Sequence, residues 1–168
     1  MGDDIETSVR AMRIMARGDL AELGEVIHPE AVNREARQEP PDCRVQGPAA
    51  FAASARWLRS AFADLDFDIH DTVASGDLVV VHCTMSGHQV GTFVTYAEDG
   101  RVAGAFPATG QRMAVTQTHW TRMRDGLVVE HWANRDDLGQ GVQLRWVPPT
   151  PLYLWRMARA KRQAARQR

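Results

Sequence analysis

The sequence predicts an α+β fold in which helices come first and antiparallel strands follow. Three observations support it. Apolar residues recur at helical spacing before residue 62, they alternate with polar residues after residue 66, and Asp125-Gly126 is typical of a tight hairpin turn. Helices followed by strands indicate helices packed on one side of a sheet. The 168 residues, 44% of them hydrophobic, suffice for one domain with its own core.

Two main helices are expected in the first third of the chain, each marked by an apolar stripe at spacings of four, three and four residues. The stripes are Ile5, Val9, Met12, Ala16 and Phe51, Ala55, Leu58, Phe62. Gly18 and Asp19 separate the first helix from a short one ending near Val26. Pro48 suits the start of the second main helix, where a missing N–H does no harm. Residues 28–47 are polar with three prolines and are expected to be mostly loop.

Strands are expected over residues 67–73, 78–85, 113–123 and 127–134, where β-branched and apolar residues alternate with polar ones. The segment 91–112 between them is expected to be a loop-heavy excursion with a turn at 98–100. Cys83 lies in an apolar strand run. We therefore expect Cys43 and Cys83 to be buried free thiols and not a disulfide.

Charge is distributed unevenly along the chain. The net charge is −1, which shows no basic footprint for nucleic acid. Residues 151–168 carry six basic residues and no acid, so residues 1–150 carry −7. We divide the chain into a domain of residues 1–146 and a Pro-rich linker with a basic helical tail at 147–168. That tail is expected to be solvated or packed on the domain, and contact with a membrane or an acidic partner is the alternative.

Targeting signals are not evident. No window approaches the ~18 uninterrupted apolar residues of a membrane span. The acidic N-terminus lacks the charged-then-apolar layout of a signal peptide. A cytoplasmic protein is therefore expected.

The Asp125-Gly126 turn predicts a register for the last two strands. If Arg124 and Leu127 close the turn, the numbers of facing residues sum to 251, and facing side chains share one face of the sheet. His131 is then expected on the opposite face from His119. The face that carries His119 gathers the candidate site residues of this hairpin: Gln117, His119, Trp132, Asn134 and Asp136.

This face combines an aromatic wall, amides, an imidazole and a carboxylate, which is the composition of a small-molecule pocket. The alternative is a solvent-exposed polar face whose side chains pair with one another. No metal site is expected, because His82, His88 and His119 have no ligand spacing of known specificity. The sequence also contains no Gly-rich phosphate loop and no Gly-x-Ser-x-Gly elbow.

Three segments, in this order, resemble the SnoaL-like polyketide cyclases of the nuclear transport factor 2-like superfamily. They are "RGDLAELGEVIHPEAVNREA", "AFADLDFDIHDTVASGDLVVVHCTMSGHQVGTF" and "FPATGQRMAVTQTHWTRMRDGLVVEHWANRDDLGQGVQL". The third is the most specific, with Pro-x-Thr-Gly, an Asp-Gly hairpin, Glu-His-Trp, and an Asp four residues past the Trp. The resemblance implies a cone: a curved antiparallel sheet wrapped around the N-terminal helices, with a cavity inside for a small apolar molecule. It also implies a homodimer through the sheet.

The resemblance further implies an enzyme without metal or organic cofactor, in which an aspartate acts as acid and base in an intramolecular aldol condensation. Asp136 matches that aspartate, although Asp137 follows it directly. His119 and Gln117 match positions that line the cavity, and His119 is assigned to catalysis with Asp136. The predicted substrate-binding residues are Gln117, Trp132, Asn134, Asn33 and His88.

Two other functions remain open at this stage. The same cavity suits a protein that binds a hydrophobic ligand without catalysis. It also suits an enzyme that adds water to an epoxide, for which an Asp–Arg–Asp arrangement is expected, whereas Arg135 is predicted to point away from Asp136. The substrate is not given by the sequence.

Overall fold

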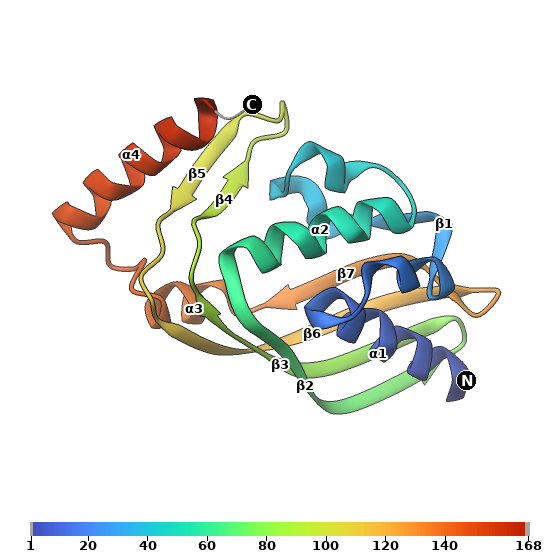
Figure 1. Ribbon diagram of the computed structural model, residues 1–168. Helices are drawn as coiled ribbons and strands as arrows, with labels where there is room; N and C mark the ends of the chain where they lie inside the picture. Colours follow the sequence, from blue (N-terminus) through green and yellow to red (C-terminus); the bar gives the residue numbers. More distant parts are fainter. Residues whose placement is uncertain (1, 167–168) are drawn as a thin grey trace.

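The computed structural model describes residues 2–166 and has the predicted order of helices before strands. Figure 1 shows the chain as a curved sheet with helices over one face and a separate hairpin beyond its end. The elements are α1 (Gly2–Arg17), η1 (Leu20–Glu25), β1 (Ile27–Asn33), η2 (Arg34–Gln38), η3 (Pro41–Arg44), α2 (Pro48–Ala61), β2 (Phe62–Ser75), β3 (Leu78–Gln89), β4 (Phe93–Tyr96), β5 (Val102–Phe106), β6 (Arg112–Arg124), β7 (Leu127–Arg135), α3 (Asp137–Gln143) and α4 (Pro151–Arg166).

The main sheet has five strands in the order β1-β7-β6-β3-β2. Strands β2, β3, β6 and β7 pair antiparallel, as predicted, but β1 pairs parallel to β7, so the sheet is mixed. The sheet curves around α1 and α2 without closing on itself (Figure 1). The α+β cone expected from the sequence is therefore confirmed, with the parallel edge strand as an addition.

The two helices bury the faces that their apolar spacing indicates, with small residues where helix and sheet approach closely. In α1 the buried residues are Ser8, Ala11, Met12, Ile14 and Ala16. Helix α1 ends before Gly18, where an added Cβ would lie 2.7 Å from the Ile14 Cα. Helix α2 starts at Pro48. The preceding Gly47 has a φ of 84°, which glycine adopts with little steric cost because it has no Cβ.

The inner face of the sheet supplies the other half of the core. Along β3 every second residue is buried, in the order expected for a strand with one face covered. Cys83 lies in this row, and Cys43 is buried in η3, so both are free thiols as predicted. The inner face thus combines an apolar floor with the polar residues Gln117, His119 and Thr121 of β6, which are also buried.

The segment 91–112 is more regular than predicted. Strands β4 and β5 form a second, two-stranded sheet joined by a turn, in which the Ala97 N–H donates to the Arg101 carbonyl at 2.8 Å. Gly91 lies where the chain enters this hairpin, and an added Cβ would stand 2.0 Å from the Ser60 carbonyl oxygen. The chain therefore enters this hairpin in close contact with the end of α2.

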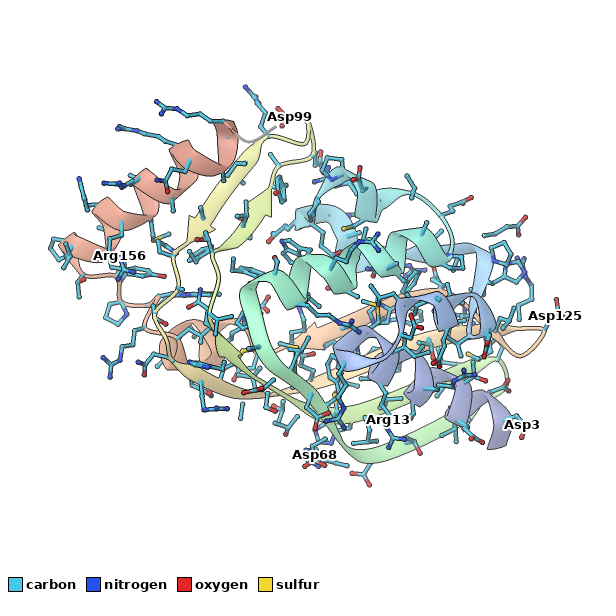
Figure 2. The ribbon with its side chains drawn as sticks, viewed as in Figure 1. Asp3, Arg13, Asp68, Asp99, Asp125 and Arg156 are labelled. Atoms are coloured by element: carbon cyan, nitrogen blue, oxygen red, sulfur yellow. The ribbon has the colours of Figure 1, made fainter. Side chains whose placement is uncertain are left out.

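The basic tail forms α4, which runs beside β5 (Figure 1). Its one buried residue is Tyr153, whose hydroxyl donates to the Pro107 carbonyl at 3.2 Å. Arg156 donates to the Ala108 carbonyl at 3.0 Å. Figure 2 shows the remaining basic side chains of α4 projecting outward. Within residues 2–166, no helix combines the length and apolar character of a membrane span.

Candidate active site

A cavity of about 330 Å³ lies between the concave face of the sheet, helices α1 and α2, and the β4–β5 hairpin. Its volume is within the range of small-molecule sites. Its walls are mostly apolar and include Met12, Met15, Phe51, Leu58, Phe67 and Met85. The internal cavity expected from the family resemblance is present.

Aromatic side chains from three separate segments form one end of the cavity. Phe93 of β4 and Phe106 of β5 stack against Trp146, with ring centroids 5.6 and 4.5 Å from it. The buried Gln89 holds this end together, because its side-chain oxygen accepts from the Trp146 indole N–H at 3.2 Å and from the Thr109 N–H at 3.2 Å. The excursion after β3 thus supplies a wall of the cavity.

The β6–β7 hairpin has the predicted turn but a different register beyond it. Asp125 and Gly126 both have positive φ, 53° and 76°, as a type I′ turn requires. Met123 faces Val128 as predicted. Arg122 then faces Glu130, so Val129 is an extra residue, and the numbers of facing residues sum to 252 from there on. This β-bulge turns every later side chain of β7 to the other face of the sheet.

The bulge overturns three placements made from the sequence. His131, predicted to face away, lines the cavity together with Ala133 and Arg135. Trp132 and Asn134, predicted to line it, lie on the outer face. There the Trp132 ring stacks on Trp120 at 6.1 Å, and the Asn134 side-chain oxygen accepts from the Trp120 indole N–H at 3.1 Å.

A sequence signal for the bulge existed. The unshifted register places the charged Glu130 on the buried face beside Thr121, where a carboxylate without a partner would be costly. With the bulge, Glu130 lies outside and pairs with Arg34 and Arg122. The adjacent Val128 and Val129 interrupt the alternation at the same point, and such an interruption is typical of a bulge.

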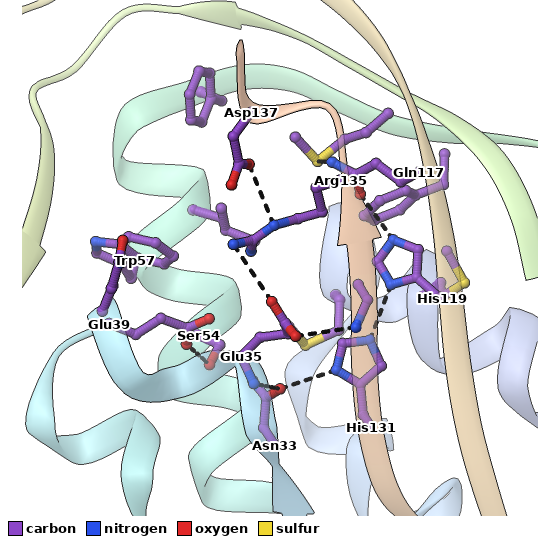
Figure 3. Close-up of a pocket in the computed structure, with 18 of the residues that line it drawn as sticks. Asn33, Glu35, Glu39, Ser54, Trp57, Gln117, His119, His131, Arg135 and Asp137 are labelled. Carbon is purple, nitrogen blue, oxygen red and sulfur yellow. Dashed lines mark hydrogen bonds and ion pairs between the residues drawn. The ribbon is translucent and has the colours of Figure 1, made fainter. Parts of the chain in front are cut away.

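A chain of hydrogen bonds runs across the cavity wall through two histidines (Figure 3). Asn33 Oδ1 lies 2.9 Å from His131 Nδ1, and His131 Nε2 lies 2.9 Å from His119 Nδ1. His119 Nε2 lies 2.8 Å from the Gln117 side-chain oxygen. All four ring nitrogens are therefore engaged. The structure brings together Asn33, Gln117 and His119, which the sequence singled out, and adds His131.

Burial lowers the pKa values of both histidines. Desolvation is the main cause for His119, and the neighbouring His131 and Arg135 lower its pKa further, to well below 6.5. Desolvation, with a smaller effect of Arg135, lowers the pKa of His131 to about 4. Both rings are consequently neutral near pH 7.

On the opposite side of the cavity lies a buried carboxyl group that the sequence did not reveal, that of Glu39 (Figure 3). Glu39 is the C-cap that follows η2 and precedes Pro40 and Pro41, whose fixed φ angles stiffen the chain there. Its side chain accepts a hydrogen bond from the Ser54 hydroxyl of α2. Desolvation raises the pKa of Glu39 above its usual 4.5, against the lowering effect of hydrogen bonds from Ser54 and Cys43.

An arginine between two carboxylates occupies the remaining polar part of the wall. Arg135 Nη2 lies 3.4 Å from Glu35 Oε2, and Arg135 Nε lies 3.4 Å from Asp137 Oδ1. The Glu35 carboxylate also accepts from the Ala133 N–H at 3.1 Å, and this hydrogen bond holds the η2 side chain against β7. The Asp137 side chain is 70% exposed, so this group extends toward solvent.

Asp136 and His88 do not line this cavity. Asp136 is exposed and is the N-cap of α3, with its carboxylate accepting from the Gly139 N–H at 2.7 Å. His88 Nε2 contacts the Gly110 carbonyl oxygen at 3.1 Å. Of the two adjacent aspartates, Asp137 is the one on the cavity wall. Among residues 2–166, no three His, Cys, Asp or Glu side chains are grouped to hold a metal ion.

Comparison with known proteins agrees with this fold. A family model described as SnoaL-like polyketide cyclase matches residues 6–144. The chain belongs to this family. The matched region includes every strand of the cone and the polar cavity residues named above, and it ends before α4.

Two curated proteins are similar to this chain over most of their length. Aklanonic acid methyl ester cyclase DnrD of Streptomyces peucetius is 31% identical over 152 residues, covering 90% of this chain and 97% of that protein. Aklanonic acid methyl ester cyclase DauD of Streptomyces sp. strain C5 is 30% identical and covers 90% and 87%. Among solved structures, TsrD from Streptomyces laurentii is 28% identical with a TM-score of 0.68, covering 85% of this chain and 95% of that one.

Proposed function

We propose that this SnoaL-like protein is a cofactor-independent cyclase that closes a ring by intramolecular aldol condensation in a polyketide-like substrate. One observation carries the proposal: a carboxyl group with a raised pKa lies in an apolar cavity, across from a wall of neutral imidazole and amide groups. The names of the two aklanonic acid methyl ester cyclases and the family's description as polyketide cyclases support ring closure in a substrate of this kind.

Glu39 is the acid and base of the proposed reaction. Its carboxylate removes a proton from a carbon between two carbonyls, and the electron pair remains as an enolate. The enolate carbon forms a bond to the carbon of a further carbonyl group in the same molecule. The π electrons of that carbonyl move to its oxygen. That oxygen then takes the proton from Glu39. A raised carboxyl pKa suits both transfers, because it makes the carboxylate a stronger base while the protonated group can still donate.

The rest of the cavity orients the substrate and excludes water. Phe93, Phe106 and Trp146 close one end, and the indole N–H of Trp57 is occupied by the Val94 carbonyl at 2.8 Å. The wall at Gln117 and His119 supplies the polar contacts. His119 reaches a substrate only by exchanging its hydrogen bond to Gln117, since both of its ring nitrogens have partners.

The proposal moves the acid and base role from Asp136 to Glu39 for a physical reason. A catalytic carboxyl needs an apolar surrounding that raises its pKa. Asp136 is exposed and already satisfied by the Gly139 N–H, whereas Glu39 is only 5% exposed.

The test uses aklanonic acid methyl ester as substrate and compares Glu39→Gln with Asp136→Asn. We expect Glu39→Gln to lower kcat by ~100-fold or more, as for loss of a general acid or base, with an unchanged circular dichroism spectrum. Asp136→Asn is the matched control and should retain turnover. The assignment fails if Glu39→Gln is as active as the unmodified protein. Tight binding without turnover by that protein would indicate the alternative of a non-catalytic ligand carrier.

A second candidate function is favoured by the Glu35–Arg135–Asp137 group, which resembles the acid–arginine–acid arrangement expected for water addition to an epoxide. In that reaction Glu35 would remove a proton from water as the water oxygen attacks an epoxide carbon, the epoxide C–O bond would break, and the released oxygen would take a proton from solvent, toward which the group extends. Hydrolysis of limonene oxide in ¹⁸O-labelled water distinguishes the two. A labelled diol formed by the unmodified protein but not by Glu35→Gln supports epoxide hydrolysis. If no diol forms, this second function is rejected.

The homodimer through the outer face of the sheet stays a prediction. Trp120 and Trp132 stack on that face and are partly exposed in the single chain. Light scattering of the unmodified protein and of Trp132→Arg tests it, with a dimer mass expected only for the former.

A further inference from the structure

In the hydrogen-bond chain Asn33–His131–His119–Gln117, the donor and acceptor roles are fixed at the Asn33 end. Asn33 Oδ1 accepts from the Glu35 backbone N–H at 3.1 Å, and an N–H group can only donate. The same oxygen lies 2.9 Å from His131 Nδ1. Because an amide oxygen only accepts, Nδ1 of His131 must carry a proton.

From this end the protons of the chain follow one by one. A neutral imidazole has one N–H, so His131 Nε2 is an acceptor. His119 must then donate from Nδ1 across the 2.9 Å contact between the rings. His119 Nε2 is therefore an acceptor and needs a donor 2.8 Å away, where the Gln117 side-chain oxygen stands. If the oxygen of the Gln117 amide points at His119, two acceptors face each other: the unprotonated His119 Nε2 and that oxygen.

Two arrangements remove this conflict. In the first, the pair of rings holds an additional proton and one ring is an imidazolium. In the second, the Gln117 carboxamide is rotated by half a turn, so that its NH₂ group donates to His119. A carboxamide has nearly the same shape in both orientations, so the side chain need not move otherwise.

The surroundings of the rings decide between the two. A buried charge without a counter-ion costs several kcal/mol. Arg135 adds repulsion, and its two neighbouring carboxylates, Glu35 and Asp137, are already paired with it. Glu39 lies on the opposite side of the cavity with a raised pKa. Rotating the amide loses only the 3.5 Å contact of its nitrogen with the Met85 sulfur, a weak acceptor.

The rotation leaves the oxygen of Gln117 beside the Met85 sulfur, a thioether that has no proton to donate. Gln117 is 3% exposed and lines the cavity, as does Met85. A buried carbonyl oxygen without a donor costs about 1–3 kcal/mol, and a ligand hydroxyl in the cavity can recover that free energy.

We propose that the fixed polarity of Asn33 turns the Gln117 carboxamide so that its oxygen faces the cavity and accepts a hydrogen bond from a phenolic or enolic hydroxyl of the substrate. This inference rests on the proposed function for the role of the cavity, and it adds a substrate class: a polycarbonyl compound that also carries a free hydroxyl at this wall. His131 and Asn33 are positioning residues, because they act on the substrate only through His119 and Gln117.

The first test needs no substrate. Nitrogen-15 NMR of the histidine rings at neutral pH distinguishes protonated from unprotonated ring nitrogens. We expect His131 protonated at Nδ1 only and His119 protonated at Nδ1 only. A proton on His119 Nε2 would overturn the proposal, because Gln117 would then accept from His119. The variant Asn33→Leu removes the acceptor for the His131 proton and should release this pattern.

The second test measures binding of two matched probes, 2-hydroxyanthraquinone and 2-methoxyanthraquinone. The unmodified protein should bind the hydroxyl compound ~10-fold or more tightly than the methyl ether, since only the former donates to Gln117. In Gln117→Leu this preference should disappear, so that the two probes bind with the same affinity. Equal affinities in the unmodified protein would overturn the proposal.

The outcomes separate this inference from the proposed function. A clear preference for the hydroxyl probe, without turnover of any polycarbonyl substrate, would reject the cyclase and keep the hydroxyl site. Turnover that depends on Glu39, without the preference, would reject the hydroxyl site and keep the cyclase.

Discussion

The substitution His131→Gln is expected to reduce the loss of stability that the protein suffers in acid. His131 is neutral in the folded protein, with a pKa lowered from 6.5 to about 4 by desolvation and by Arg135. In the unfolded chain the pKa returns to about 6.5, so the unfolded state binds the proton first. The stability that this histidine contributes is complete above pH 6.5 and is lost as pH falls from 6.5 to about 4.

The magnitude follows from the difference between the two pKa values. Each factor of ten in proton affinity is worth about 1.4 kcal/mol, so the change from 6.5 to about 4 corresponds to about 3 kcal/mol of unfolding free energy. Glutamine does not titrate and can still donate to Asn33. The pKa of His119 should also rise in this variant, because His131 contributes to its lowering.

Urea denaturation at a series of pH values from 7 to 4 measures this effect. We expect the unmodified protein to lose about 3 kcal/mol or more beyond the loss of His131→Gln over that interval, because the raised pKa of His119 in the variant adds to the difference. His88→Gln, which removes a histidine outside the cavity, is the matched control and should behave like the unmodified protein. Equal losses in the unmodified protein and His131→Gln would refute the reasoning.

Three further predictions concern other parts of the fold. Gly91→Ala places a Cβ 2.0 Å from the Ser60 carbonyl oxygen, so thermal unfolding should show a loss of about 1–3 kcal/mol. Asp136→Ala removes the cap of α3 and should cost about 1 kcal/mol in urea denaturation without loss of cyclase activity; loss of activity would return Asp136 to the catalytic site. Tyr153→Ala should detach α4 from Pro107 and speed tryptic cleavage of the tail by roughly tenfold or more, since burial of a large ring contributes about 1.5–3 kcal/mol; an unchanged cleavage rate would mean that other contacts hold α4.

The face of β6 could be predicted correctly from the sequence because a strand alternates its side chains regularly and the Asp125-Gly126 turn sets where that alternation starts. Gln117 and His119 are on the cavity wall for this reason. The face of β7 was predicted wrongly beyond Val128, because one bulged residue reverses the alternation. Glu130 was the warning in the sequence, since the unshifted register buries its charge.

Glu39 could not be recognised from its neighbours in sequence. It lies in a polar segment with three prolines, where a carboxylate normally faces solvent. Its burial depends on Ser54 of α2 and on Cys43 of η3, which the fold brings beside it. The arginine–carboxylate group likewise joins η2, β7 and α3, three elements whose proximity depends on the parallel pairing of β1 with β7.

The sequence by itself determined the order of helices and strands, the hairpin turn, the buried thiols and the family, because these depend on local spacing and on ordered motifs. Only the tertiary structure decided which side chains share the cavity and in what state of protonation. The physical reason is that burial and hydrogen-bond partners arise between segments distant in the chain. The polarity of the wall at Gln117 is set from Asn33, 84 positions earlier in the sequence, through two histidines that a single bulge brought to the same face.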